Sequence, residues 1–210
     1  MNLALMNLDL VKKAMARQFH RPSGMGGRLA GWVMAHRSSN RRRNRWVVSL
    51  LDVRPADRVL EVGFGPGIAI AELSRRATAG VVYGVDHSDV MVRQATRRNA
   101  AAVRARRVRL VQAPSDRLPA FDEPFDAVMA VNTLGMWPEP ARRLAELRAL
   151  LKPGGRIAIA SQPRCPGATA ETSARAAQEI IDQLREAGFA RTRVETLPLK
   201  PPVVCVLAEH

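Results

Sequence analysis

Three glycines on alternate residues follow a short apolar run and form the most chemically suggestive stretch of this 210-residue sequence. The run is Val59–Val62, and Gly63, Gly65 and Gly67 come directly after it. Glycine has no Cβ, so a ligand can approach the backbone closely at these positions. The helical pattern that begins near Pro66 would direct the free N–H groups of its first turn at an anionic group over the loop. The stretch therefore predicts a strand, a glycine turn and a helix that cradle a nucleotide-like ligand.

An acidic residue ends the next apolar run and narrows the class of ligand. Asp86 follows Val81–Val85, where it could accept both hydroxyls of a ribose bound at the switch point of a parallel sheet. The dinucleotide fingerprint requires its third glycine at the position of Ile68, whereas here the glycine is at 67, so NAD binding is disfavoured. The Gly-Lys-Ser/Thr sequence of P-loop enzymes is also absent.

Apolar runs alternate with helical patterns from Asp57 onward, which predicts βαβ units and a mainly parallel α/β sheet with helices on both faces. The predicted strands are Val59–Val62, Val81–Val85, Val108–Val111, Phe125–Val131 and Arg156–Ala160, and the predicted helices span 66 to about 76, 88 to about 99, 139–151 and about 169 to 187. Gly188 is expected to cap the last helix. Thr192–Leu197 and Val203–Leu207 have no helix between them and are expected to pair antiparallel.

Residues 1–50 form a separate helical segment in this interpretation, and residues 51–210 form the ligand-binding domain. Apolar residues at helical spacing predict a first helix ending near Arg17, a second around Leu29 to His36, and a third that places Trp46, Val47, Leu50 and Leu51 on one face and arginines on the other. A loop rich in Gly and Pro, residues 19–27, separates the first two. We expect this segment to act as a lid over the ligand.

The chain is strongly basic, with 33 Lys and Arg against 19 Asp and Glu and a formal net charge of +14. Basic residues concentrate in 1–50 and 93–109, and such patches could attract nucleic acid, an acidic membrane surface or an anionic substrate. The other interpretation is a compositional bias toward arginine. Cys165 and Cys205 lie far apart without metal-ligand spacing, and no stretch is long and apolar enough to span a bilayer. We therefore expect a soluble, cytoplasmic protein without a metal site or stable membrane insertion.

With these motifs, the sequence from about Leu50 to His210 resembles the class I S-adenosylmethionine-dependent methyltransferases. Four segments carry the resemblance: Glu61–Gly67, Gly84–Ser88, Phe125–Val128 with Asn132, and Leu151–Gly155 before the fifth strand. The resemblance implies a Rossmann-like three-layer sandwich, whose seven-stranded, mainly parallel sheet has its last strand antiparallel between the fifth and the sixth. It also implies methyl transfer, with S-adenosylmethionine as cofactor, S-adenosylhomocysteine as product and no metal.

The resemblance also implies which residues bind the cofactor. They are Glu61, Gly63, Phe64, Gly65, Gly67, Asp86, His87, Ser115, Asp116 and Asn132. The backbone at Gly63 and Gly65 would hold the methionine moiety, and Asp86 the ribose. Many relatives have Gly-Asp-Ala before a Leu-Pro pair at the adenine site, but here Ala113-Pro114-Ser115-Asp116 precedes Leu118-Pro119. The adenine amino group would then need Ser115, Asp116 or a backbone carbonyl as its acceptor, and these alternatives stay open.

Methyl transfer from a sulfonium is an in-line displacement that needs a general base only if the acceptor arrives protonated. Among the histidines His20 is the best candidate for that base, because His87 would border the adenine and His36 lies on an apolar helical face. The candidate substrate pocket consists of Phe19, Met25, Trp32, His36, Met136 and Trp137. Leu134 could join it, although core packing is the better explanation for that residue. These residues predict a small, apolar or aromatic acceptor.

Two other function classes remain open at this stage. An RNA or DNA methyltransferase would account for the basic segments, but Val131-Asn132-Thr133-Leu134 lacks the Asn/Asp-Pro-Pro-aromatic motif of enzymes that methylate exocyclic base amines. A module that binds the cofactor without transferring methyl groups is the second. A weaker addition is membrane-surface association through the first helix. The expected partner is a small molecule rather than nucleic acid, and the oligomeric state stays open, a homodimer included.

Overall fold

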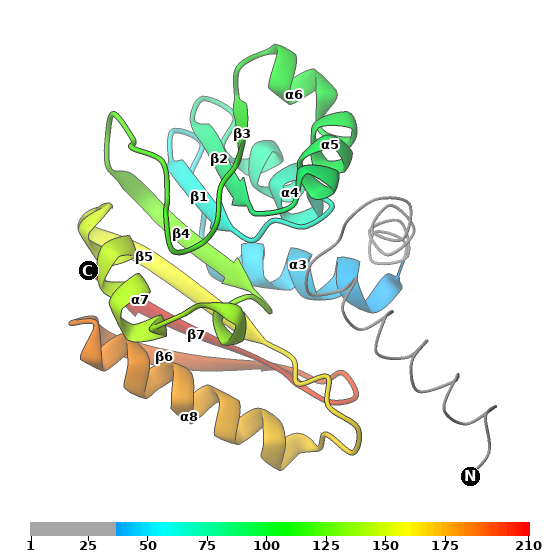
Figure 1. Ribbon diagram of the computed structural model, residues 1–210, viewed down its shortest axis with the longest axis vertical. Helices are drawn as coiled ribbons and strands as arrows, with labels where there is room; N and C mark the ends of the chain where they lie inside the picture. The colour runs from blue at the N-terminus through cyan, green and yellow to red at the C-terminus, as the bar shows by residue number, and fades with distance from the viewer. Residues whose placement is uncertain (1–36) are drawn as a thin grey trace, which may run out of the picture.

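Seven strands form one sheet between two layers of helices (Figure 1). The computed structural model describes residues 37–210. The strands are β1 (Arg58–Val62), β2 (Val81–Asp86), β3 (Val108–Gln112), β4 (Phe125–Val131), β5 (Leu151–Ser161), β6 (Ala190–Leu197) and β7 (Val203–Glu209). Their order is β3-β2-β1-β4-β5-β7-β6, in which β7 lies antiparallel between β5 and β6 and the other neighbours pair parallel. The predicted seven-stranded sheet with its antiparallel last strand is confirmed.

Helices cover both faces of the sheet, and the inner strands β1, β2 and β4 are buried along almost their whole length. The helices are α3 (Ser38–Leu50), α4 (Ile68–Arg76), α5 (Asp89–Arg98), α6 (Ala100–Arg104), the 3-10 turn η1 (Leu134–Met136), α7 (Pro140–Ala149) and α8 (Ala170–Glu186). Apolar residues of α3, α4 and α5 share one core with alternate strand residues, and those of α7 and α8 share another on the opposite face. Figure 1 shows α7 and α8 in front of the strands and α3 behind them.

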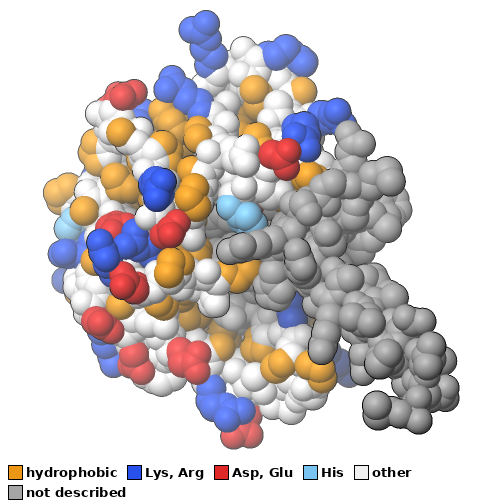
Figure 2. Space-filling view, in the orientation of Figure 1, with side chains coloured by type: hydrophobic (Ala, Val, Ile, Leu, Met, Phe, Trp, Pro, Cys, Tyr) orange, Lys and Arg blue, Asp and Glu red, His pale blue; other side chains and the backbone are white. Residues whose placement is uncertain are grey.

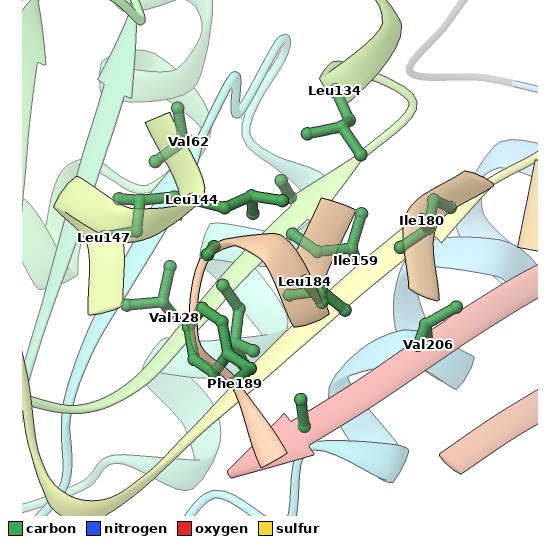
Figure 3. Packing of buried hydrophobic residues seen from close by; sticks show 14 of the residues in the cluster. Val62, Val128, Leu134, Leu144, Leu147, Ile159, Ile180, Leu184, Phe189 and Val206 are labelled. Carbon is green, nitrogen blue, oxygen red and sulfur yellow. The ribbon is translucent and has the colours of Figure 1, made fainter. Parts of the chain in front are cut away.

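The core under α7 and α8 shows how periodicity positions these elements (Figure 3). Leu144 and Leu147 on α7, and Ile180 and Leu184 on α8, recur at three- and four-residue spacing and are all buried against the sheet. Gly188 follows the C-terminal end of helix α8 and has a φ of +84°. The Gly188 N–H donates to Arg185 O at 2.9 Å, and the Phe189 N–H donates to Leu184 O at 2.9 Å. This is a Schellman motif, and the predicted cap at Gly188 is confirmed.

The differences from the predictions include two element boundaries and one helix. Helix α4 begins at Ile68 rather than Pro66, because Gly67 is its N-cap and holds the left-handed φ of +76°. Strand β5 begins at Leu151 rather than Arg156; Phe125 pairs with Leu151 but Ala127 with Arg156, so residues 152–155 form a bulge within the strand. Helix α6 was not predicted; a single residue, 99, ends α5 and begins α6.

The described part of the N-terminal segment is helix α3, which packs on the sheet. Val47, Val48 and Leu51 lie in the same core as α4 and α5. The expectation that arginines occupy only the outer face of this helix is wrong, because Arg43 lies four residues before Val47 on the buried face. The two earlier helices predicted in residues 1–36 lie outside the described residues. None of the helices in residues 37–210 is long and apolar enough to cross a membrane.

Candidate functional site

The carboxyl ends of β1, β2 and β4 bring together the motifs that the sequence singled out. These strands are parallel neighbours, so the glycine loop after β1 lies beside Asp86 at the end of β2 and Asn132 just after β4. The Gly63 N–H donates to Val85 O at 2.7 Å, which extends the pairing of β1 and β2 into the loop. Ligands of open α/β sheets bind at this edge, where neighbouring connections leave on opposite faces.

The glycine loop needs glycine for two distinct reasons. Gly63, Gly65 and Gly67 have φ values of +79°, +52° and +76°, a region that residues with a Cβ rarely adopt. A Cβ on Gly63 would lie 2.2 Å from Cγ2 of Thr133, and one on Gly67 would lie 2.6 Å from Cβ of Ala95. No atom of residues 37–210 would lie within 4 Å of a Cβ on Gly65. Gly63 and Gly67 therefore allow the loop to pack tightly, while at Gly65 this part of the chain leaves open space.

Asp86 is tied to this loop by its carboxylate. Its Oδ2 accepts from the Gly65 N–H at 2.8 Å, and its Oδ1 accepts from the Ser88 N–H at 2.9 Å. Burial raises the pKa of Asp86, and the two backbone bonds and the nearby His87 oppose that shift. Each oxygen keeps a further lone pair, so the carboxylate can still accept from hydroxyl groups of a ligand. The predicted ribose acceptor is thus placed at the glycine loop.

Glu61 is a buried acid without a complete set of partners. Its side chain in β1 is 1% exposed, and its Oε2 has no hydrogen-bond partner among residues 37–210. Burial, and next the negative charge of Asp86, raise the pKa of Glu61 to about 8, while a backbone bond from Ile70 lowers it. A buried carboxylate needs a cation or donors to offset its desolvation. The negative charge of Asp86 thus disfavours ionisation of Glu61 on the neighbouring strand. This part of the protein therefore favours a ligand that carries positive charge.

The loop after β3 lies next to Asp86, as the adenine site requires. The Ala113 N–H donates to Asp86 O at 3.0 Å, and Gln112 Nε2 donates to His87 O at 3.2 Å. His87 is exposed, with Nδ1 3.7 Å from Asp86 Oδ1. Ser115 is half-buried and Asp116 is exposed. The side chains of His87, Ser115 and Asp116, which are predicted to contact the cofactor, are therefore at least partly accessible.

Arg143 on α7 fixes this loop, and the sequence analysis missed it. Its side chain is buried, and its Nη1 donates to the Asp116 backbone O at 2.9 Å and to Glu146 Oε2 at 2.7 Å. Only its fold-dependent contact reveals this positioning role, because nothing in the local sequence distinguishes Arg143 from the neighbouring arginines.

The segment after β4 serves mainly to join strands. Asn132 has φ +58°, and its Oδ1 accepts from the Gln162 N–H at 2.7 Å, so it links the ends of β4 and β5. Thr133 Oγ1 donates to Val62 O at 3.2 Å, which links the ends of β4 and β1. Asn132 thus lies just after β4, as predicted, but its side-chain amide oxygen already accepts a hydrogen bond from Gln162. Thr133 and Gln162 are positioning residues that the sequence analysis did not identify.

Three predicted site residues differ in how far a ligand could reach their side chains. Met136 in η1 is 43% exposed, whereas Trp137 is 7% exposed and belongs to the core under α7 and α8, as does Leu134. Phe64 is buried in the opposite core, where its Cδ1 would lie 2.7 Å from a Cβ on Gly84. Phe64 can therefore offer a ligand its backbone but not its ring. Phe19, His20, Met25, Trp32 and His36 lie outside the described residues.

Comparisons with known proteins identify the family. Residues 59–155 match a family model described as a methyltransferase domain. The chain is 31% identical over 182 residues to an uncharacterized methyltransferase, YdaC, of Bacillus subtilis, with 86% of this chain and 97% of the relative covered. The chain belongs to the class I S-adenosylmethionine-dependent methyltransferases. Glu61, the glycine loop and Asp86 all lie within the matched methyltransferase domain.

Two further similarities are to a relative that matches about half of the chain and to a solved structure with the same fold. The methyltransferase is 30% identical over 116 residues to the ubiquinone/menaquinone biosynthesis C-methyltransferase UbiE of Geotalea daltonii, with 55% of this chain and 49% of the relative covered. It therefore spans about half the length of that protein. A crystal structure of a SAM-dependent methyltransferase from Aquifex aeolicus shares the fold with a TM-score of 0.64 at 23% identity, over 79% of this chain and 88% of that one.

The residues present fit S-adenosylmethionine on two structural grounds. The unpartnered Oε2 of Glu61 suits a ligand with an ammonium and a sulfonium, and the open space over Gly65 leaves room for it at the loop. The backbone of the glycine loop would contact the methionine moiety of this cofactor, and Asp86 would accept from its ribose hydroxyls. Among residues 37–210, no group of three His, Cys, Asp or Glu side chains gathers as a metal site.

Proposed function

We propose that this methyltransferase transfers the methyl group of S-adenosylmethionine to a small, apolar or aromatic acceptor. The observation that carries the acceptor class is Met136, a large apolar side chain that is 43% exposed at the end of β4. It lies four residues after Asn132, on the segment that leaves the cofactor edge. The similarity to the ubiquinone/menaquinone biosynthesis C-methyltransferase UbiE of Geotalea daltonii further supports an acceptor of this kind.

The chemistry asks little of the protein beyond binding and orientation. S-adenosylmethionine supplies an activated methyl group on a sulfonium, so alignment and exclusion of water can provide much of the acceleration. We assign donor binding to Glu61, the backbone of the glycine loop and Asp86. Asn132 and Thr133 hold the strand ends in place. His20 remains our candidate for a general base if the acceptor is protonated.

Formation of S-adenosylhomocysteine from a panel of acceptors tests this proposal. The panel holds phenols, hydroquinones, aromatic amines and small thiols, with an unmodified RNA and a duplex DNA as further arms. We expect product with at least one small aromatic member and none with nucleic acid. Methylation of RNA or DNA alone would refute the proposal. Binding of S-adenosylmethionine without any methylated product would instead favour the non-catalytic alternative.

A further inference from the structure

Three arginines gather at the carboxyl end of β5, outside the cofactor loop. Helix α3 runs antiparallel to β5. The backbone O of Leu51, just after the C-terminal end of α3, accepts from Nε of Arg156 in the middle of β5 at 3.0 Å. At the other end, Arg43 Nη1 donates to Gln162 Oε1 at 2.6 Å, just after the strand. Arg37 caps α3, and Arg164 lies two residues after Gln162. We refer to Arg37, Arg43 and Arg164 as the arginine cluster.

No carboxylate balances this cluster among residues 37–210. None of the three arginines forms an ion pair with an acid in this part of the chain. Arg43 is only 3% exposed; its guanidinium also donates to Asn40 Oδ1, and its Nε has no partner. Residues 1–36 contain a single acid, Asp9. The chain therefore buries one cation and places two more beside it with almost no acid to neutralise them.

The cost of this arrangement is visible in the electrostatics of Arg43. Burial, and then the charges of Arg164 and Arg37, lower its pKa to about 9. Burying a charge without a partner of opposite sign is unfavourable, because hydrogen bonds alone do not fully replace its hydration. A purely structural role, holding α3 against the loop after β5, would need only the bond to Gln162. It would not need Arg37 and Arg164, which are exposed.

We propose that the arginine cluster binds the carboxylate group of an anionic methyl acceptor. Gln162 connects the cluster to the cofactor edge, because its Oε1 accepts from Arg43 and its N–H donates to Asn132 Oδ1 at 2.7 Å. An acceptor held by the cluster would thus lie next to the end of β4. Arg43 supplies the inner donor and the two exposed arginines the rim, and guanidinium groups match a carboxylate in geometry. This inference rests on the proposed function and adds an anionic group to its acceptor.

Thermal unfolding with saturating S-adenosylhomocysteine tests the proposal with paired probes. Sodium benzoate is compared with benzamide, its neutral isostere, and inorganic phosphate with chloride at equal ionic strength. The variants are Arg37→Gln and Arg164→Gln, which change exposed side chains, and Arg104→Gln is the control at a remote exposed arginine. Arg43→Gln is added, although its folding must be checked because it also frees Gln162.

We expect benzoate to raise the melting temperature of the unmodified protein and benzamide to leave it unchanged. Each rim variant should weaken the apparent affinity for benzoate by about tenfold or more, while R104Q should not. An equal response to benzamide, no response to benzoate, or an unaltered response in both rim variants would overturn the proposal. A response to phosphate alone would also overturn it, since the cluster would then bind a free oxyanion rather than an acceptor. Calorimetric binding of S-adenosylhomocysteine by the same variants shows whether the cofactor site is intact, and the acceptor panel described above tests methyl transfer separately.

Discussion

Binding of the cationic donor should release a proton from Glu61, and the Glu61→Gln variant should not release it. The pKa of Glu61 is raised to about 8, first by burial and second by the charge of Asp86. A cation near its unpartnered Oε2 would stabilise the ionised form and lower that pKa again. The proton that Glu61 holds in the free protein would then leave on binding.

The magnitude follows from the titration of one group. With a pKa of about 8, Glu61 is about 0.9 protonated at pH 7, so binding should release about 0.9 proton from it. The sign of the pH dependence follows from the same shift. Because the free protein holds the proton more tightly than the complex, affinity falls as pH falls below about 8. The slope is about tenfold per pH unit until the pKa of the complex is reached.

Calorimetry in two buffers of different ionisation enthalpy measures the released protons directly. S-adenosylmethionine is titrated at pH 7 into the unmodified protein, E61Q and Glu186→Gln, whose parent residue is exposed on α8. The unmodified protein and E186Q should release about 0.9 proton more than E61Q. Equal proton release by all three proteins would refute the assignment of Glu61 as the group that meets the donor's positive charge.

Two further predictions test the glycine loop and the general base. Gly63→Ala should lower the free energy of unfolding by about 2 to 5 kcal/mol, from its φ of +79° and a Cβ 2.2 Å from Thr133 Cγ2. Adding Thr133→Ser removes that methyl group. The double variant should recover about 1 to 3 kcal/mol of the lost free energy of unfolding, measured by urea unfolding, because the steric contact is relieved. A double variant no more stable than G63A would show that this contact is not the cause. His20→Gln should lower turnover much more than donor affinity, measured by steady-state kinetics beside calorimetry. Unchanged turnover would remove His20 from the mechanism.

Most of the fold could be predicted because its signals are local. Alternation of apolar runs with helical spacing located every strand of the sheet, and the missing helix between Leu197 and Val203 indicated the antiparallel pair. Helix α6 was missed because the chain interrupts its helical course at a single residue and resumes it for one short turn. Helix α4 starts late because the third glycine takes a left-handed φ, which glycine permits but does not require.

The site could be predicted only where its residues lie at or near the end of a strand. Glu61, the glycines and Asp86 follow directly from strand boundaries, and the structure brings them together. Arg43 and Gln162 could not be paired in advance, because their contact joins residues 119 positions apart and depends on how α3 docks. The ring of Phe64 turned into the core because β2 has a glycine at position 84 to accommodate it. Such contacts depend on tertiary packing, which single-sequence periodicity does not encode.

Calorimetric titration of S-adenosylhomocysteine into the Asp86→Ala variant is the most direct test of the cofactor site. Asp86 holds the glycine loop through Gly65 and would accept the ribose hydroxyls. The variant should bind at least about tenfold more weakly than the unmodified protein, because hydrogen bonds to a charged acceptor contribute about 1.5 to 3 kcal/mol. R104Q should bind as the unmodified protein does, and circular dichroism should show that both variants are folded. Binding at full strength by folded D86A would contradict the account.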